Sequence, residues 1–370
     1  MKKIAIIFGT RPEAIKMAPV IKELKKCQDI KPLVITTAQH RELLDQVLEL
    51  FHLKPDYDLD IMQTEQSLNQ ITIRILQQLD PILEKENPDM LLVHGDTTTT
   101  FVTSLAGYYN QLPIGHIEAG LRTYDKYRPF PEEMNRHLTG VLSDLHFAPT
   151  GDAKDNLLKE GIPEERIFVT GNTVIDALLK IFKGNYKFTS KVLNNIDFKK
   201  RKQILITAHR RENLGQPLIK ICQAVKMILE QLSDVEVIFP VHPNPKVQRI
   251  VNESLGEESR VYLINPLSYN EFVNLMGRVD IILTDSGGIQ EEAPSLGKPV
   301  LVLREKTERP EAVNAGTVRL VGHNSEQIIN ESIKLLNDED VYSQMAQIKN
   351  PYGDGKAAKY IKEILITYFR

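Results

Sequence analysis

The strongest constraint on the fold is an alternation along the whole chain, in which short runs of β-branched and other apolar residues are followed by longer stretches of helical period. The helical period is clearest where Leu68, Ile71, Ile75, Leu79 and Leu83 recur three or four residues apart. Such alternation is typical of parallel sheets covered by helices on both faces. The strands that we expect occupy residues 4–8, 33–36, 90–94, 114–117, 167–170, 204–207, 235–240, 261–264, 281–284 and 300–303.

This alternation occurs twice, which predicts two domains. A typical domain has about 100 to 200 residues, so a chain of 370 residues is too long for one ordinary core. The pattern is interrupted at residues 183–202, which are polar, basic and rich in asparagine. The expected fold is therefore α/β, with two doubly wound, Rossmann-like domains. We place the first over residues 1–171, a hinge or linker over 172–202, the second over 203–355, and a terminal helix over 356–370 that packs back on the first domain or lies against the second.

Composition and charge exclude several classes of protein. Hydrophobic residues make up 42% of the chain and charged residues 26%, which is typical of a globular enzyme. A net charge of −3 gives no general attraction to nucleic acid or anionic lipid, so neither is expected as a partner. The sequence contains no apolar run of 18 residues and no signal peptide. Cys27 and Cys222 have no metal-ligand spacing, which predicts free thiols, no metal site, and a reducing, cytoplasmic location.

In the second half, the stretch TDSGGIQEEAPSLGKPVLVLRE at residues 284–305 predicts a nucleotide-binding turn. Gly287 and Gly288 follow a buried strand and allow a sharp turn into a helix that begins near Ile289. Unpaired N–H groups at such a helix end favour a phosphate, and a carboxylate nearby can accept hydrogen bonds from a ribose. An explanation without a ligand is equally open, in which Ser286 caps the helix and Glu292 interacts with its dipole.

Charged residues also follow the expected strands of the first half. The turn GTRPEAIK carries two cations but matches neither a GxGxxG nor a Walker A motif, so NAD and P-loop ATP chemistry are not expected. HGDTTTT, HIEAGLRT and RPFPEEMNR place acids at two strand ends and one helix start; helix capping is the ordinary explanation for the first of them. Together they predict a carboxylate-lined pocket. The residues concerned are Arg11, Lys16, Asp96, Glu118, Glu132 and Glu133.

The second half adds two histidines and further cations. His209 ends a strand in TAHRRENLG beside Arg210 and Arg211, whose charge would favour the neutral, proton-accepting histidine. His242 ends the next strand in PVHPNP, and Arg309 lies in TERPEA after a later one. Each signal is weak by itself, and a lone histidine is more often structural than catalytic.

Taken together, these blocks closely resemble the non-hydrolysing UDP-N-acetylglucosamine 2-epimerases. The matching motifs are GTRPEAIKMAP, HGDTTTT, HIEAGLRT, PEEMNR, TGNTVIDAL, TAHRREN, TDSGGIQEEAPSLGKPVL and ERPEA. They run from residue 4 to about residue 355. The resemblance implies a GT-B fold, with two Rossmann-like domains facing across a cleft, a homodimer, and interconversion of UDP-GlcNAc and UDP-ManNAc without a cofactor.

The resemblance also implies roles for the residues singled out above. Phe272 would lie near the uracil, Glu292 on the ribose, and Ser286, Gly287 and Gly288 on the diphosphate, with Arg309 close by and His242 among the substrate-binding residues. Arg11 and Lys16 would stabilise the leaving group. The candidate catalytic residues are Asp96, Glu118, Glu132 and His209.

The chemistry is consistent with such a mixture of groups. The C2 proton of the sugar is not next to a carbonyl, so a carboxylate with a pKa near ~4 cannot simply remove it. Breaking the anomeric C–O bond first would make that proton more acidic, giving UDP and a glycal to which UDP then returns. The base and the acid cannot be assigned among the four candidates. The alternatives are a hydrolysing 2-epimerase, a GT-B glycosyltransferase and a UDP-sugar-binding regulatory module. For the non-hydrolysing epimerase, the product UDP-ManNAc would serve cell-surface polysaccharide synthesis.

Some bacterial members of this family have a second, activating UDP-GlcNAc site near the TAQHR segment. Gln39 and Arg210 are candidates for such a site in this sequence. Glu42 and Glu65 place acids where relatives have glutamine and arginine. Because acids repel a diphosphate, we expect weakened activation, and a sigmoidal rate curve would contradict this.

Overall fold

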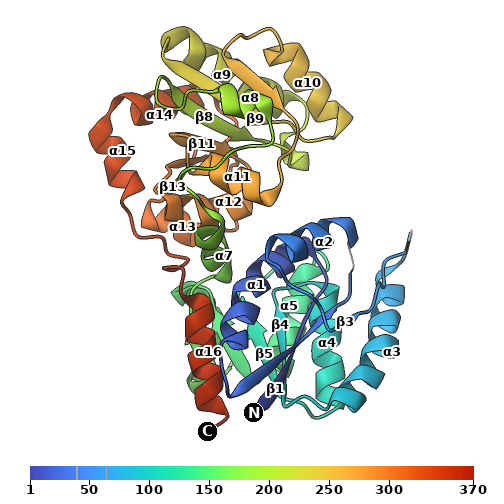
Figure 1. The fold of residues 1–370 in the computed structure, drawn as a ribbon. Coiled ribbons are helices and arrows are strands. Elements are labelled where there is room, and N and C mark those ends of the chain that lie inside the picture. Colours follow the sequence, from blue (N-terminus) through green and yellow to red (C-terminus); the bar gives the residue numbers. More distant parts are fainter. Residues whose placement is uncertain (39–40, 64) are drawn as a thin grey trace. The chain divides into compact units, whose positions relative to one another are not determined.

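The structure is a computed structural model that describes residues 1–38, 41–63 and 65–370, except for the side chains of Arg41, Glu42 and Arg211. The chain forms two compact units (Figure 1). The first comprises Met1–Ala177 with Tyr352–Arg370, and the second comprises Leu178–Pro351. Each unit is an α/β structure with one parallel sheet, as the alternating pattern predicts.

The first unit contains a seven-stranded parallel sheet in the order β3-β2-β1-β4-β5-β6-β7. The register places Ile4 of β1 opposite Pro32 of β2 and Met90 of β4. Apolar residues of α3 and α4 pack against β1, β2 and β4 to form one core cluster. The strands are β1 Lys2–Phe8, β2 Ile30–Thr36, β3 Tyr57–Asp58, β4 Met90–His94, β5 Ile114–Ile117, β6 Leu145–Ala148 and β7 Ile167–Val169. The helices are α1 Arg11–Lys25, α2 Arg41–Leu50, α3 Leu68–Glu86, α4 Thr98–Tyr109, α5 Glu132–Leu142, α6 Gly151–Lys159, α7 Thr173–Ile181 and α16 Ala357–Tyr368.

The second unit contains a six-stranded parallel sheet in the order β10-β9-β8-β11-β12-β13. Its core is formed by β8, β9 and β11 with apolar side chains of α9, α10 and α14. The strands are β8 Lys202–Thr207, β9 Val235–Pro240, β10 Val261–Ile264, β11 Ile281–Thr284, β12 Val300–Val302 and β13 Val318–Leu320. The α-helices are α8 Lys191–Asn195, α9 Gln216–Gln231, α10 Pro245–Leu255, α11 Tyr269–Met276, α12 Gly287–Glu292, α13 Pro310–Ala315, α14 Ser325–Asn337 and α15 Glu339–Ala346.

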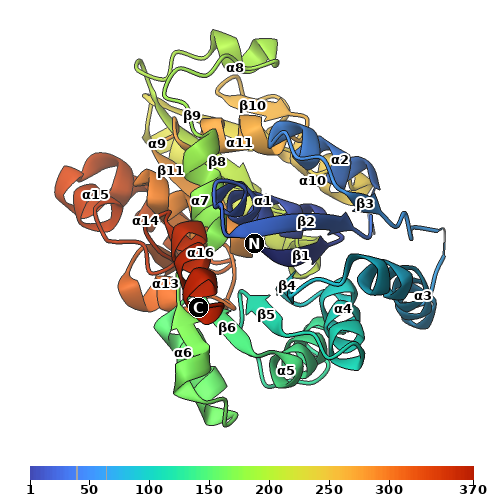
Figure 2. The ribbon, with the colours of Figure 1, turned by 60° about the horizontal axis from the view of Figure 1, so that its bottom comes forward.

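The boundary between the units lies inside a helix. α7 begins in the first unit and ends in the second, and the range 172–202, where we expected a linker, contains α7 and α8. The terminal helix α16 belongs to the first unit, where it contacts α1 (Figure 2). The backbone N–H groups of Ala357 and Ala358 hold it in place, because they donate to the buried Asp176 at 3.1 and 3.0 Å.

The ten expected strands are present, and the structure adds three that the pattern did not show. β3 has only two residues and β13 only three, so neither is long enough to give a period. β6 has the sequence LHFA, with a buried histidine in place of a β-branched residue. Cys27 and Cys222 are both free thiols, and burial raises the pKa of Cys222 to about 11.

Three buried histidines make the first unit sensitive to acid. His94, His116 and His146 lie in β4, β5 and β6, and burial is the main cause that lowers their pKa values, to about 4, 3 and 4. Each is neutral in the fold but becomes protonated near pH ~6.5 when unfolded. The unfolded state therefore binds more protons at low pH, and the stability present above pH ~6.5 is lost as pH falls toward ~4.

We expect the free energy of unfolding to fall by several kcal/mol between pH ~7 and pH ~5, because the full pKa shift of each histidine corresponds to roughly 3 to 5 kcal/mol. Urea unfolding at the two pH values measures the loss. His146→Gln, which removes one of the three groups, should reduce it. An equal loss in the variant would show that this histidine does not couple folding to pH.

Candidate active site

Sheet topology brings the predicted charged residues of each unit to one sheet edge. In the first sheet the strand order reverses direction between β1 and β4, and in the second it reverses between β8 and β11. The crevice beyond the carboxyl ends of strands at such a reversal is where open α/β sheets bind ligands. Arg11 and Lys16 follow β1 and Asp96 follows β4, whereas His209 follows β8 and Ser286 follows β11. The two half-sites are therefore at the expected place in each sheet.

Glu118, after β5, occupies a strained backbone position and is held by two side chains. Its φ is +64°, which a non-glycine residue rarely adopts and which costs on the order of 1–3 kcal/mol. Its Oε2 atom pairs with Lys16 Nζ and accepts a hydrogen bond of 2.8 Å from Asn172 Nδ2. The side chain is only 9% exposed. Strain of this kind accumulates where function requires a specific orientation, which supports a role for this carboxylate.

His94 lies beside this ion pair and was not singled out in the sequence. Its Nε2 is 3.9 Å from Glu118 Oε2, and neither ring nitrogen has a hydrogen-bond partner among the described residues. Burial lowers its pKa to about 4; the charge of Glu118 opposes this and that of Lys16 adds to it. His94 is therefore neutral near pH 7. Asn172 was also missed, although it lies within the TGNTVIDAL motif.

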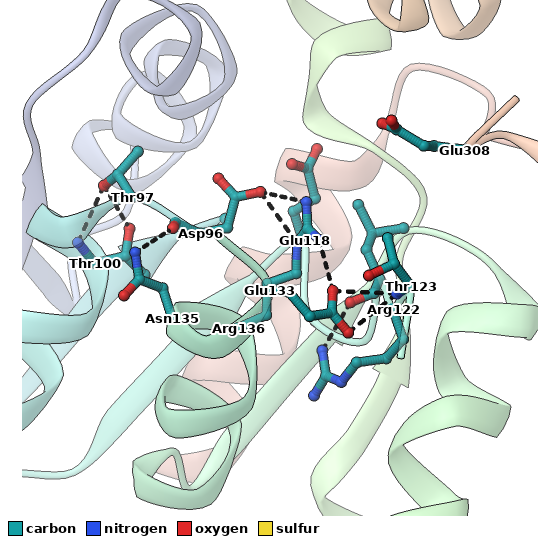
Figure 3. A network of polar contacts seen from close by, with 12 residues as sticks. Asp96, Thr97, Thr100, Glu118, Arg122, Thr123, Glu133, Asn135, Arg136 and Glu308 are labelled. Carbon is teal, nitrogen blue, oxygen red and sulfur yellow. Dashed lines mark hydrogen bonds and ion pairs between the residues drawn. The ribbon is translucent and has the colours of Figure 1, made fainter. Parts of the chain in front are cut away.

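Asp96 does not cap α4, contrary to the ordinary explanation considered for it. The cap is Thr97, whose Oγ1 accepts from Thr100 N at 3.2 Å. The Asp96 carboxylate instead pairs with Arg136 of α5, and Asn135 donates to its backbone carbonyl at 2.9 Å (Figure 3). The side chain of Asp96 remains 27% exposed. Asp96 is thus an anchored carboxylate that solvent or a ligand can reach.

Two adjacent glutamates at the start of α5 have different surroundings. Glu133 is 1% exposed and accepts hydrogen bonds from the backbone N–H groups of Thr123 and Tyr124 (Figure 3). Glu132 has a buried Oε2 atom with no hydrogen-bond partner in the described part of the chain. An unpartnered buried carboxylate oxygen is costly in a fold and is found where a ligand supplies the partner. Glu132 is therefore the functional candidate of the two, and Glu133 is structural.

The turn between β1 and α1 is held by a further buried acid, Glu13, which was not among the predicted site residues. Glu13 accepts from Gly9 N at 3.0 Å and Thr10 N at 2.8 Å, and from Thr97 Oγ1 at 2.7 Å. Burial raises its pKa, and these hydrogen bonds partly offset the effect. Arg11, two residues earlier, is half-buried and forms no ion pair with a described residue. The turn is thus rigid, and the guanidinium of Arg11 is available to an anionic ligand.

In the second unit, the carboxylate of Asp285 organises the half-site. Asp285 is fully buried, and its Oδ2 accepts three hydrogen bonds of 2.8 Å, from His209 N, Arg210 N and Asn213 Nδ2. Its Oδ1 lies 3.3 Å from His209 Nδ1. The ring of His242 stacks on His209 with centroids 5.3 Å apart. Burial, followed by the charge of His209, lowers the pKa of His242. Asp285 follows β11 directly but was not among the candidate site residues.

Two guanidinium groups flank the glycines after β11. A Cβ atom built on Gly287 would lie 3.8 Å from Arg210 Nη2 and 3.9 Å from Arg309 Cζ. Ser286 precedes α12 but makes no capping hydrogen bond with its side chain, and α12 begins at Gly287 rather than near Ile289. Ser286 therefore occupies the N-cap position as expected, but its side chain does not cap the helix. The turn combines small residues with two cations, as a diphosphate site requires.

Glu291 and Glu292, the two adjacent acids of this motif, contact different partners. Glu291 is 1% exposed and pairs with the guanidinium Nε of Arg309. Glu292 accepts a hydrogen bond of 2.5 Å from the hydroxyl of Tyr269 in α11, the helix that also carries Phe272. Glu292 is 6% exposed and Phe272 is half-buried. The positions of Glu292 and Phe272 within one unit are consistent with a nucleoside pocket.

The candidate second site lies mostly beyond what the structure describes. Gln39 and the side chain of Glu42 are outside the described residues. Arg210 belongs to the second unit, where it flanks Gly287. Across residues 1–38, 41–63 and 65–370, no three His, Cys, Asp or Glu side chains form a group that could hold a metal ion. No helix in the same ranges is long and apolar enough to cross a bilayer.

Comparison with known proteins connects both half-sites to one family. Residues 22–366 match a family model described as UDP-N-acetylglucosamine 2-epimerase. The UDP-N-acetylglucosamine 2-epimerase of Bacillus subtilis is 53% identical over 371 residues, covering 100% of this chain and 97% of that protein. The Escherichia coli enzyme of the same name is 54% identical over 368 residues, covering 98% of each chain.

Solved structures agree with this result. The crystal structure of UDP-GlcNAc 2-epimerase from Neisseria meningitidis, bound to UDP-GlcNAc, superimposes with a TM-score of 0.87 at 52% sequence identity. The match covers 99% of this chain and 100% of that one. The similarity therefore extends over both units and both sheets.

Proposed function

Because the chain belongs to the UDP-N-acetylglucosamine 2-epimerase family, we propose that it interconverts UDP-GlcNAc and UDP-ManNAc by elimination and readdition of UDP. The observation that carries this proposal is the carboxylate cluster of the first unit. Asp96 and Glu118 each pair with a cation, and Glu132 has an unpartnered buried oxygen. Such a cluster suits a reaction that forms a cationic sugar and also moves a proton.

The elimination follows from the weak acidity of the C2 hydrogen. The anomeric C1–O bond breaks, its electron pair leaves with the β-phosphate of UDP, and positive charge develops at C1. A base then takes the C2 proton, the C–H electrons form the C1=C2 double bond, and a glycal results. Return of a proton to the opposite face of C2 and attack of UDP oxygen on C1 complete the inversion. No redox step occurs, so no redox cofactor is required.

The surroundings of the acids suggest their roles. The cations beside Asp96 and Glu118 hold these two carboxylates in place, where they can stabilise positive charge at the sugar ring. Glu132 forms no ion pair with a described residue, and we assign it to proton transfer. Inversion requires a second proton carrier for the other face. His209 suits this role, because its ring is 42% exposed and lies 3.3 Å from the buried carboxylate of Asp285.

The second unit would bind UDP. Ser286, Gly287 and Gly288 would contact the diphosphate, with Arg210 and Arg309 supplying positive charge. The carboxylate of Glu292 would accept from the ribose hydroxyls, Phe272 would lie against the uracil, and His242 would complete the pocket. In the first unit, Arg11 and Lys16 would stabilise the departing diphosphate. The ligand in the N. meningitidis structure supports UDP-GlcNAc as the substrate.

A methyl group at the diphosphate turn should weaken UDP binding without unfolding the protein. A Cβ atom on Gly287 meets no atom closer than 3.8 Å, and its backbone requires no positive φ, so Gly287→Ala is expected to fold normally. The added methyl would occupy the space in front of Arg210 and Arg309, and we expect the Kd of UDP to rise about tenfold, or ~1.4 kcal/mol. Isothermal titration calorimetry measures this change. An unchanged Kd would place the diphosphate elsewhere.

Assembly and pathway are further parts of this proposal. Large apolar side chains of α4 and α5, which contact one another, are exposed, and we propose that they form a homodimer interface. They are Tyr108, Tyr109, Leu138 and Val141. The product would supply cell-surface polysaccharide synthesis from the cytoplasm. Light scattering of the Val141→Glu variant, compared with the unsubstituted protein, tests the interface.

The reaction is tested by proton NMR of UDP-GlcNAc incubated with the purified protein in D2O, without added NAD or metal. The proposal expects UDP-ManNAc with deuterium at C2 and the nucleotide still attached. Accumulation of free N-acetylmannosamine and UDP would identify a hydrolysing epimerase. No reaction until an acceptor is added would identify a glycosyltransferase.

A further inference from the structure

One turn of α5 connects Asp96 to the segment that follows Glu118 (Figure 3). We propose that Arg136 is a positioning residue for the reaction, which orients the Asp96 carboxylate through one oxygen and leaves the other oxygen for the substrate. This inference rests on the proposed function, in which Asp96 stabilises positive charge at the sugar.

The contact between Arg136 and Asp96 is directional. Arg136 Nε and Nη2 both donate to Asp96 Oδ2, at 3.0 and 2.6 Å. Asp96 Oδ1 has no hydrogen bond to a described residue. A planar guanidinium that holds one carboxylate oxygen with two N–H groups fixes the plane of that carboxylate as well as its charge. Oδ1 is therefore the atom of Asp96 that is available to a ligand.

The same helical turn also fixes the backbone of Asp96. Asn135 Nδ2 donates to the Asp96 carbonyl at 2.9 Å. Glu132, Asn135 and Arg136 are spaced three and four residues apart, so they share one face of α5. This face presents two residues that hold Asp96 and one acid with an unpartnered oxygen. The relative placement of Asp96 and Glu132 therefore depends on this one turn.

Arg136 is itself held from behind by a buried anchor. Its Nη1 donates to Glu133 Oε2 at 3.0 Å, and the Arg136 side chain is only 12% exposed. Burial would raise the pKa of Glu133, but hydrogen bonds from the backbone of Tyr124 and Thr123 and the charge of Arg136 lower it overall. Glu133 is thus ionised near pH 7. The guanidinium is clamped between two carboxylates and has little freedom to move away from Asp96.

A double-mutant cycle separates positioning from general structural support. We expect Arg136→Gln to lower kcat about 100-fold with KM changed less than about threefold, because the charge stabilisation by Asp96 operates in the transition state. In the Asp96→Asn background, the same substitution should lower kcat less than about threefold further. Arg319→Gln, which removes an arginine paired with Glu331 on the second unit, is the matched control and should leave kcat unchanged.

The conservative variant distinguishes positioning from a stability effect. Arg136 is the charged group that the described residues bring into contact with Asp96, with Glu133 behind it. Arg136→Lys should lower kcat only about tenfold, and so restore part of what Arg136→Gln loses, since lysine retains the charge but not the planar pair of donors. The lysine variant also serves if the glutamine variant does not fold.

Failure of this inference is distinguishable from failure of the proposed function. If the unsubstituted protein does not epimerise UDP-GlcNAc, or if Asp96→Asn has full activity, the proposed function or its site is wrong. If both single substitutions lower kcat but their effects multiply in the double variant, Arg136 acts independently of Asp96 and the inference is wrong. Equal losses of kcat in Arg136→Lys and Arg136→Gln would overturn it as well.

Discussion

Replacing Glu132 with glutamine is expected to lower kcat about 1000-fold while leaving the stability of the protein nearly unchanged. The Oε2 atom of Glu132 is buried without a partner among the described residues, so the fold gains little from its charge. Loss of a positioned acid or base costs roughly 10²–10⁴ in rate. Steady-state kinetics with UDP-GlcNAc, together with urea unfolding, measure both quantities.

The neighbouring glutamate provides the matched control for this experiment. Glu133 is 1% exposed and receives hydrogen bonds from two backbone N–H groups and from Arg136. Glu133→Gln should therefore lower the free energy of unfolding by roughly 2 kcal/mol, because strong hydrogen bonds to a buried charge are weakened. If the two variants lose stability equally and Glu132→Gln is fully active, the catalytic role assigned to Glu132 is wrong.

Replacing Asp285 with asparagine is expected to damage both activity and folding of the second unit. Its carboxylate holds the backbone of His209 and Arg210 and lies 3.3 Å from His209 Nδ1. An amide there lacks the charge of the carboxylate and is a weaker acceptor, which would loosen the backbone of His209 and Arg210. We expect kcat to fall about 100- to 1000-fold and the free energy of unfolding to fall by roughly 2 kcal/mol.

His209→Asn is the corresponding control in the second unit. The His209 side chain is 42% exposed, so its removal should leave the unfolding free energy within about 0.5 kcal/mol while lowering kcat to a similar extent. Urea unfolding and kinetics of the two variants therefore distinguish the structural role of Asp285 from the catalytic role of His209. A fully active Asp285→Asn enzyme would show that His209 does not depend on this carboxylate.

Most of the fold could be predicted from local sequence pattern. Short segments rich in apolar residues, such as 281–284, alternate with helical periods, and these segments were correctly predicted as strands. The short strands β3 and β13 have too few residues to show a period, and they form because a neighbouring strand offers an edge to pair with. The boundary between the two units after Ala177 could not be seen in the sequence, because the helical pattern of α7 continues across it and only the tertiary contacts change there.

Much of the candidate site could also be recognised, because charged residues directly after buried strands are visible in sequence. The sequence could not show which partner each acid would have. Lys16 and Glu118 are 102 residues apart, and Arg136 lies 40 residues from Asp96. His94, Asn172 and Asp285 were missed because each resembles an ordinary strand or cap residue until its distant neighbour is known.

The sequence by itself therefore determined the parallel α/β architecture, the two-domain plan and the positions of most acids and cations at strand ends. These depend on periodicity and on turn residues within a few positions of one another. Only the tertiary structure decided that Glu132 and Glu133 differ, that Asp96 is held by Arg136 and that Asp285 lies beneath His209. Burial and ion pairing depend on atoms that the fold brings together from distant parts of the chain, and a local sequence pattern does not show which distant residues these are.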